Sequence, residues 1–168
     1  MALAIVLSLF IGNKVSFNRM RAELDDVFVN GVDGDGFSIQ GDLDVIKDNG
    51  NSIIAIAKRY IGDDSSIKDA SDSLQKLAEA DSIKDKSRAL DDFAQTIEIF
   101  YRSFKDNGKL SESDLRLLKM CYSEIESRLM TIRSNGYNDK VAEYNNARKS
   151  FPAGIISPLM GVKAQENF

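Results

Sequence analysis

Apolar residues recur along this chain in alternating steps of three and four, and this spacing constrains the fold more than any other feature. Four segments carry the spacing: Phe17, Met20, Leu24 and Val27; Ile39, Leu43, Ile46, Gly50, Ile53, Ala57 and Tyr60; Leu90, Phe93, Ile97, Phe100 and Phe104; and Leu115, Leu118, Tyr122, Ile125, Leu129 and Ile132. A repeat that averages about 3.5 residues keeps the apolar face of each helix turned toward its neighbours in a left-handed bundle. The sequence therefore predicts an all-α fold, an antiparallel up-and-down bundle of four long helices plus short helical pieces.

Polar and glycine-rich stretches divide the chain between these segments. Residues 30–36 predict a loop, and Ser38 is placed to cap the helix that follows. Ser-x-x-Asp sequences are typical of helix starts. They occur at Ser66–Asp69, Ser82–Asp85 and Ser111–Asp114. They predict a short helix near 66–80, a long helix near 83–106 and a last long helix from about 111.

The apolar spacing slips between Ile132 and Tyr137, across residues 134–136. Asn135-Gly136 is a typical helix stop, so one interpretation ends the helix here. The other interpretation keeps one long helix with a local bulge that absorbs the extra residue. The residues alone leave both interpretations open.

The chain contains no histidine and a single cysteine, Cys121. These absences exclude Ser-His and Cys-His nucleophilic pairs, histidine general bases, histidine-ligated metals and an internal disulfide. Cys121 falls on an apolar helical face and is interpreted as a core thiol. Adjacent carboxylates at 25–26, 63–64 and 91–92 do not face each other on a helix, so they are interpreted as solvated acids. We therefore expect no catalytic residue, no enzyme activity and no cofactor.

The charge pattern and one loop bear on nucleic-acid and metal partners. The net charge of −4, with no basic stripe, argues against a nucleic-acid partner. Residues 33–36, Asp-Gly-Asp-Gly, resemble part of a calcium-binding EF-hand loop. In that alignment the first ligand position falls on Gly31, and the last falls on Asp42 where a bidentate glutamate is usual. The sequence therefore favours a polar interhelical turn, and no metal is expected.

Residues 2–11 are apolar and uncharged, and Lys14, Arg19 and Arg21 follow them. The run is shorter than the roughly 20 apolar residues that span a bilayer, and it lacks the features of a cleaved signal peptide. Three interpretations remain open: the C-terminal half of a membrane anchor that begins before this chain, a short membrane-dipping segment, or a first helix turn packed on a partner. The basic residues that follow favour a cytoplasmic bundle.

This pattern predicts three parts of the chain. They are an apolar N-terminal segment over residues 1–11, a helical bundle domain over 12–151, and a C-terminal tail with a short apolar helix over 152–168.

The most distinctive residues lie near the C-terminus. Two Tyr-Asn pairs seven residues apart share one helical stripe, and a Phe-Pro sequence ends the helix. This C-terminal motif comprises Tyr137, Asn138, Val141, Tyr144, Asn145, Ser150, Phe151 and Pro152. It resembles the C-terminal signature of the LemA family, and the likeness extends over residues 137–161.

The resemblance implies a divergent LemA protein. The sequence Ala57-Lys58-Arg59-Tyr60 is similar to a second family pattern, whereas residues 47–53 depart from the family and lack its proline. The family implies an antiparallel helical bundle that is tethered by one N-terminal membrane helix, with the bundle in the cytoplasm. It also favours one continuous helix from about 111 to 151. The family's molecular function is not established, so no catalytic residue carries over.

The C-terminal motif is interpreted as structural. Tyr137 and Tyr144 are expected to pack in the apolar seam, and the asparagines are expected to bond a neighbouring helix. The alternative interpretation is a surface stripe that contacts a partner or lipid headgroups.

A small apolar patch follows the motif and is a candidate interaction surface, because it either closes the end of the bundle or marks a contact site. It comprises Ile155, Ile156, Leu159 and Met160. Two functions remain open. The first is a non-enzymatic, membrane-tethered scaffold or interaction module whose partners are the membrane and other proteins. The second is a sensory bundle that binds a small ligand between its helices.

Overall fold

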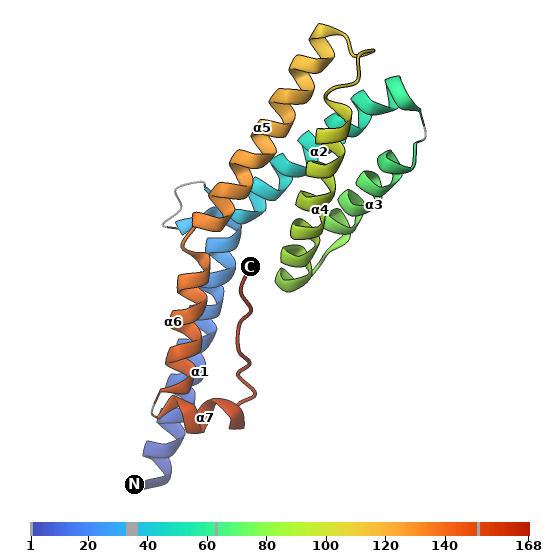
Figure 1. The fold of residues 1–168 in the computed structure, drawn as a ribbon. Helices are drawn as coiled ribbons and strands as arrows, with labels where there is room; N and C mark the ends of the chain where they lie inside the picture. The colour runs from blue at the N-terminus through green and yellow to red at the C-terminus, as the bar shows by residue number, and fades with distance from the viewer. Residues whose placement is uncertain (1, 33–36, 63, 151) are drawn as a thin grey trace. The chain divides into compact units, whose positions relative to one another are not determined.

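The computed structural model describes residues 2–32, 37–62, 64–150 and 152–168. These residues form seven α-helices and no strand (Figure 1). In chain order the helices are α1 (Ala2–Asn30), α2 (Ile39–Ile61), α3 (Ser65–Glu79), α4 (Ile83–Phe104), α5 (Glu112–Ser134), α6 (Tyr137–Lys149) and α7 (Ala153–Leu159). The all-α class is therefore confirmed. The loop at 33–36 that resembles a calcium site lies outside the described residues.

Contacts between residues group the chain into two compact units. Unit 1 comprises residues 1–38 and 135–167, and unit 2 comprises residues 39–134 with Phe168. The division into residues 1–11, 12–151 and 152–168 stays a prediction.

Unit 2 is built from α2, α3, α4 and α5. Helix α2 packs against α5 and α3, and α3 packs against α4 (Figure 1). The apolar spacing of α2 and α4 supplies much of its core, because the predicted stripe positions are buried. These positions are Ile39, Leu43, Ile46, Gly50, Ile53, Ala57, Leu90, Phe93, Ile97, Phe100 and Phe104.

Side chains at the helix starts show which predicted caps form. Ser82 caps α4, since its hydroxyl oxygen accepts a 3.0 Å hydrogen bond from the Asp85 amide. Ser111 likewise accepts from the Asp114 amide at 3.1 Å, so this predicted helix start is confirmed. The short helix predicted near 66–80 is present as α3, but the capping role predicted for Ser66 is wrong. Helix α3 begins at Ser65, because the Asp64 carboxylate accepts the Ser66 amide and caps the helix two residues earlier.

Unit 1 is built on the antiparallel pair α1 and α6 (Figure 1). The ring of Phe17 lies edge-on to Tyr144, with centroids 5.6 Å apart, and Phe28 lies edge-on to Tyr137 at 5.7 Å. Helix α1 runs without a break from the apolar N-terminal run into the Phe17 stripe. Within the described part of the chain, no helix has the length and apolar character needed to cross a membrane.

The chain is not helical throughout residues 111–151. Helix α5 ends at Ser134 and α6 begins at Tyr137, so the predicted continuous helix is wrong and the Asn-Gly stop is the correct interpretation. The cause is local: the Asn135 side chain accepts the Tyr137 amide at 3.1 Å and forms a turn in place of the helical hydrogen-bond pattern. The break also marks the boundary between the two units.

Candidate binding groove

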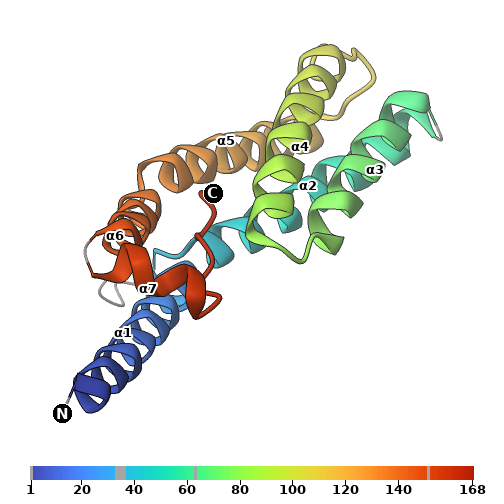
Figure 2. The ribbon, with the colours of Figure 1, turned by 90° about the horizontal axis from the view of Figure 1, so that it is seen from below.

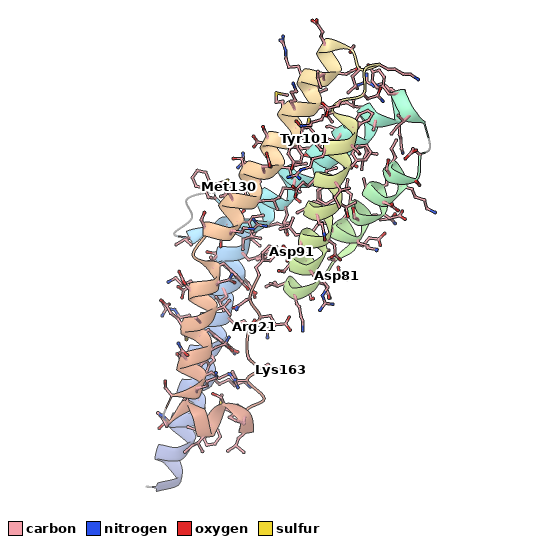
Figure 3. All side chains as sticks on the ribbon, in the orientation of Figure 1. Arg21, Asp81, Asp91, Tyr101, Met130 and Lys163 are labelled. Atoms are coloured by element: carbon pink, nitrogen blue, oxygen red, sulfur yellow. The ribbon has the colours of Figure 1, made fainter. Side chains whose placement is uncertain are left out.

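An open groove of about 460 Å³ lies between α4 and α5 in unit 2. Figure 3 labels Asp91 and Tyr101 on α4 and Met130 on α5. We call this feature the α4–α5 groove. It is lined by Asp91, Ala94, Gln95, Ile97 and Glu98 from α4, and by Tyr122, Ile125, Glu126, Leu129, Met130 and Arg133 from α5.

The floor of the groove belongs to the core of unit 2. Ile97 and Ile125 are buried, as the apolar spacing of their helices predicts. The same stripe of α5 continues through Tyr122 and Leu129, whose side chains are only half-buried. Apolar surface that the spacing assigns to the core therefore lies open in the groove. Met130 adds to this surface, because 70% of its side chain is exposed.

Two tyrosine rings hold α4 and α5 together at one part of the groove. The rings of Tyr101 and Tyr122 stack with their centroids 3.8 Å apart and their planes 4° from parallel. The ammonium group of Lys105 lies 5.9 Å from the centroid of the Tyr101 ring. Stacked aromatic rings stabilise the pairing of their elements beyond the area that they bury. This contact fixes the two walls where Tyr122 lines the groove.

Charged side chains surround the apolar floor. Asp91, Glu98 and Glu126 contribute carboxylates and Arg133 contributes a guanidinium group. Burial raises the pKa of Tyr122 to about 12, and the negative charges of Glu126 and Glu98 act in the same direction. The phenol therefore stays protonated at neutral pH and can donate a hydrogen bond.

The groove offers an apolar floor and a mainly anionic rim, which together favour a ligand with an apolar face and a polar or cationic edge. Cys121 is not one of the lining residues; it is buried, as predicted, and burial raises the pKa of its thiol. Among the described side chains, no group of His, Cys, Asp and Glu residues is arranged to hold a metal ion.

The C-terminal motif lies in unit 1, outside this groove. Tyr137, Val141 and Tyr144 are buried in the contact of α6 with its neighbours, as the structural interpretation expects. Burial raises the pKa of Tyr137 to about 12. The Tyr144 hydroxyl donates a 3.3 Å hydrogen bond to the carbonyl of Lys163 in the C-terminal tail.

Asn145 also binds the tail, so the expectation that it bonds a neighbouring helix is wrong. Its amide nitrogen donates to the Gln165 carbonyl at 2.9 Å, and its oxygen accepts from the Gln165 amide at 3.0 Å. The tail is not helical after α7, so it offers backbone groups that a helix would already pair.

The remaining motif residues lie at or near the ends of α6. Asn138 is exposed on its first turn, and Ser150 follows its last residue and donates from its hydroxyl to the Asn146 carbonyl at 2.9 Å. Pro152 directly precedes α7, and Phe151 lies outside the described residues. The functional role of the motif stays a prediction.

The apolar patch on α7 is divided between core and surface. Ile156 is buried and Met160 is half-buried, whereas Ile155 and Leu159 are largely exposed. The patch therefore contributes both to the closure of unit 1 and to an open surface.

The sequence did not predict the α4–α5 groove. Asp91 and Asp92 are both exposed, which agrees with their interpretation as solvated acids, and Asp91 also lines the groove. A signal was present in the lengths of the apolar stripes. The stripe of α5 extends over more positions than its neighbours cover, which leaves Tyr122 and Leu129 partly open.

Comparisons with known proteins give one result. The model of the LemA family matches residues 39–168, which is more than half of the chain and includes the C-terminal motif. Neither the curated proteins nor the solved structures yield a match.

Proposed function

The chain belongs to the LemA family, and from that premise we propose that it is a non-enzymatic interaction module. Its N-terminal segment holds it at a membrane. Its α4–α5 groove binds a helical segment of another protein. The observation that carries the proposal is the apolar surface that Leu129 and Met130 leave open on α5. An exposed apolar groove with a polar rim is the usual receptor for the apolar face of an amphipathic helix.

The charges of the groove support a partner helix with basic residues beside its apolar face. Glu98 and Glu126 both act on the Tyr122 ring, so they stand close to one part of the groove. Glu98 is paired with Arg102 at 2.5 Å, whereas Glu126 is exposed and accepts a hydrogen bond from the Tyr122 hydroxyl. A lysine or arginine of the partner would meet Glu126 there, and such rim charges act mainly on the association rate and on partner choice.

The protonation of the candidate nucleophiles at neutral pH supports the proposal of a non-enzymatic function. The buried Cys121 thiol has a raised pKa, which disfavours the reactive thiolate. Tyr122 and Tyr137, with pKa values of about 12, are protonated at neutral pH. No histidine is present in the chain to activate a hydroxyl group.

The membrane tether is proposed from the distribution of charge in α1. Residues 2–13 carry no charge, and the first charged side chains after them are Lys14, Arg19 and Arg21. An apolar helix end followed by basic residues is typical of segments that insert into a bilayer and leave their basic side on the cytoplasmic face. We propose the cytoplasm for both units on the same basis.

A sensory function is the second candidate, and the dimensions of the groove favour it. A volume of about 460 Å³ falls within the range of sites for small molecules, which is roughly 300–1,000 Å³. Gln95 and Tyr122 supply polar groups that could orient a small ligand. In this alternative the ligand replaces the partner helix in the same groove.

Site-specific photo-crosslinking in cells of the natural host separates these candidates. A photoreactive phenylalanine analogue is placed at Met130, inside the groove, and in a matched control at Met120, which is exposed on the same helix but does not line it. The mass of each adduct is then measured. A protein-sized adduct at position 130 only, abolished by filling the groove with Ala94→Trp, is the expected result.

The other outcomes have distinct meanings. A small-molecule adduct at position 130, also blocked by Ala94→Trp, would contradict the interaction module and support the sensory function. Equal labelling at positions 120 and 130, or labelling that Ala94→Trp leaves unchanged, would show that the groove is not the binding site in either proposed function. Retention of the Ala94→Trp fold is checked by circular dichroism.

A further inference from the structure

Helix α7 presents an apolar face to solvent. Ala153, Ile156 and Ser157 face the interior of unit 1 and are buried. The exposed residues of the helix are Ile155, Pro158 and Leu159, spaced three and four apart from Ile155 along one face. Ile155 is 65% exposed and Leu159 is 73% exposed. A surface helix normally carries polar side chains on its outer face, so this helix is adapted to an apolar contact outside its own unit.

A second apolar surface lies beside it on α1. Helix α7 packs against α1, as Figures 1 and 2 show, and in Figure 1 it lies beside the N-terminal half of that helix. The contact between Phe17 and Tyr144 explains this placement, because it pairs the C-terminal part of α6 with the N-terminal half of α1. Ile11 and Val15 of α1 are 59% and 62% exposed. Helix α7 and the N-terminal half of α1 therefore both carry exposed apolar side chains within unit 1.

The charged residues around these two segments indicate the kind of surface that the segments contact. Residues 2–13 and residues 150–162 contain no charged side chain. Each segment is bounded by exposed lysines: Lys14 follows the first, Lys149 precedes the second, and Lys163 follows it (Figure 3 labels Lys163). A membrane surface has two layers, the acyl chains and the anionic phosphates above them. Apolar side chains can enter the first layer while the flanking lysines bind the second.

We propose that α7 is a second membrane contact, lying in the interfacial layer of an anionic bilayer with Ile155, Pro158 and Leu159 among the lipids. Lys149 and Lys163 lie at the level of the phosphates. Two contacts on one compact unit, the start of α1 and α7, hold unit 1 in one orientation on the bilayer, which a single tether cannot do. This inference rests on the membrane tether proposed above and adds a contact on a separate segment.

The absence of tryptophan from the natural chain allows a direct test. Leu159→Trp places a single fluorophore on the outer face of α7. Ile99→Trp is the matched control, because Ile99 is an exposed apolar residue of unit 2, on α4. Each full-length variant is mixed with vesicles of phosphatidylcholine, with or without phosphatidylglycerol. Flotation measures binding, and lipids with brominated acyl chains measure contact of the indole ring with the bilayer.

The expected result is flotation of both variants with anionic vesicles, together with a blue shift and bromolipid quenching for Trp at 159 and neither for Trp at 99. Flotation without quenching at 159 would overturn the α7 contact and leave the N-terminal tether intact. Failure to float would overturn both. A blue shift at 159 that depends on protein concentration and occurs without vesicles would assign the face to a second copy of the chain and overturn the lipid contact.

A second pair of variants tests the contact without a reporter. The double variant Ile155→Ser/Leu159→Ser keeps the buried side of α7 and is expected to weaken vesicle binding by about tenfold or more. Lys149→Glu/Lys163→Glu is expected to weaken binding to anionic vesicles, by at least about fivefold for each charge, and to have little effect with phosphatidylcholine alone. Binding equal to that of the natural chain in both variants would overturn the proposal, provided that circular dichroism shows the helices intact.

Discussion

The hydroxyl group of Tyr60, in the last turn of α2, donates a hydrogen bond to the carboxylate of Asp114 in the first turn of α5. Arg59 reaches the same carboxylate, with 2.7 Å between its Nη2 atom and Oδ1. The Ser111 amide donates to the Tyr60 hydroxyl at 3.3 Å. This cluster joins the end of one helix to the start of another, and it stabilises the ionised form of Asp114.

Tyr60→Phe is expected to raise the pKa of Asp114. The Tyr60 hydrogen bond is the main cause that lowers this pKa in the folded protein, with smaller contributions from Ser111 and Arg59. A carboxyl group with a lowered folded pKa stabilises the fold above its ordinary pKa of 3.8, and that stabilisation is lost as the pH falls through the folded value. The natural chain should therefore lose more stability on acidification below about pH 4 than Tyr60→Phe loses.

Denaturant titrations across acidic pH, with the Asp114 carboxyl carbon followed by NMR, measure both effects. Asp92→Asn, which removes an exposed carboxylate of α4, is the control and should leave the pKa of Asp114 unchanged. An unchanged Asp114 pKa in Tyr60→Phe would mean that the hydrogen bond does not form in solution.

Gly50→Ala is expected to destabilise unit 2 by about 1–3 kcal/mol, because α2 approaches its neighbours too closely for a side chain. A Cβ atom at position 50 would lie 2.8 Å from Cζ of Phe93 and 3.3 Å from both Cδ atoms of Leu74. Phe93 is fully buried and cannot move away cheaply.

Gly12→Ala is the matched control for this substitution. Gly12 lies in α1, and a Cβ atom added there would have no neighbour within 4 Å, so the change should be neutral or slightly stabilising. Chemical denaturation measures both variants. Equal effects of the two substitutions would show that helix propensity, and not the contact with Phe93, decides the result at position 50.

The apolar spacing was sufficient to predict the helices, because the period of a helix is a local property. It correctly identified the buried stripe of α4 up to Phe104 and that of α2 up to Ala57, whereas Tyr60 is only half-buried. It also located the slip at Asn135-Gly136. The family resemblance favoured a continuous helix at this position, and that prediction was wrong. The helix breaks there because the Asn135 side chain accepts the Tyr137 amide and forms a local turn. Local chemistry therefore outweighed the resemblance at this position.

Long-range pairing could not be predicted in the same way. Asn145 binds Gln165, and no periodicity links a helix to a non-helical tail. The α4–α5 groove depends on how far apart two helices lie, which the apolar spacing within each helix does not determine. Spacing marks Leu129 as apolar, but only the arrangement of the helices decides whether a neighbour covers it.

Asn145→Ala is expected to release the C-terminal tail while α6 remains folded. The substitution removes two hydrogen bonds with Gln165, each of which contributes about 0.5–1.5 kcal/mol. Amide exchange at Gln165 should therefore accelerate by roughly tenfold or more, whereas exchange within α6 should change little. Asn146→Ala is the control, because Asn146 is the exposed neighbour on the same helix. Similar acceleration in both variants would contradict a specific role for Asn145.

Glu126→Gln is expected to lower the pKa of Tyr122 from about 12 toward its ordinary value of 10.0, without reaching it. Burial, the largest cause of the raised value, remains in the variant, and so does the charge of Glu98. Removing the Glu126 charge makes the phenolate less costly, so ionisation begins at lower pH. NMR of ring-labelled tyrosine during an alkaline titration measures the change, and Asp92→Asn should leave it unaltered. If Tyr122 titrates identically in Glu126→Gln, the carboxylate does not face the groove in solution, and the anionic rim proposed to meet a basic partner helix loses that residue.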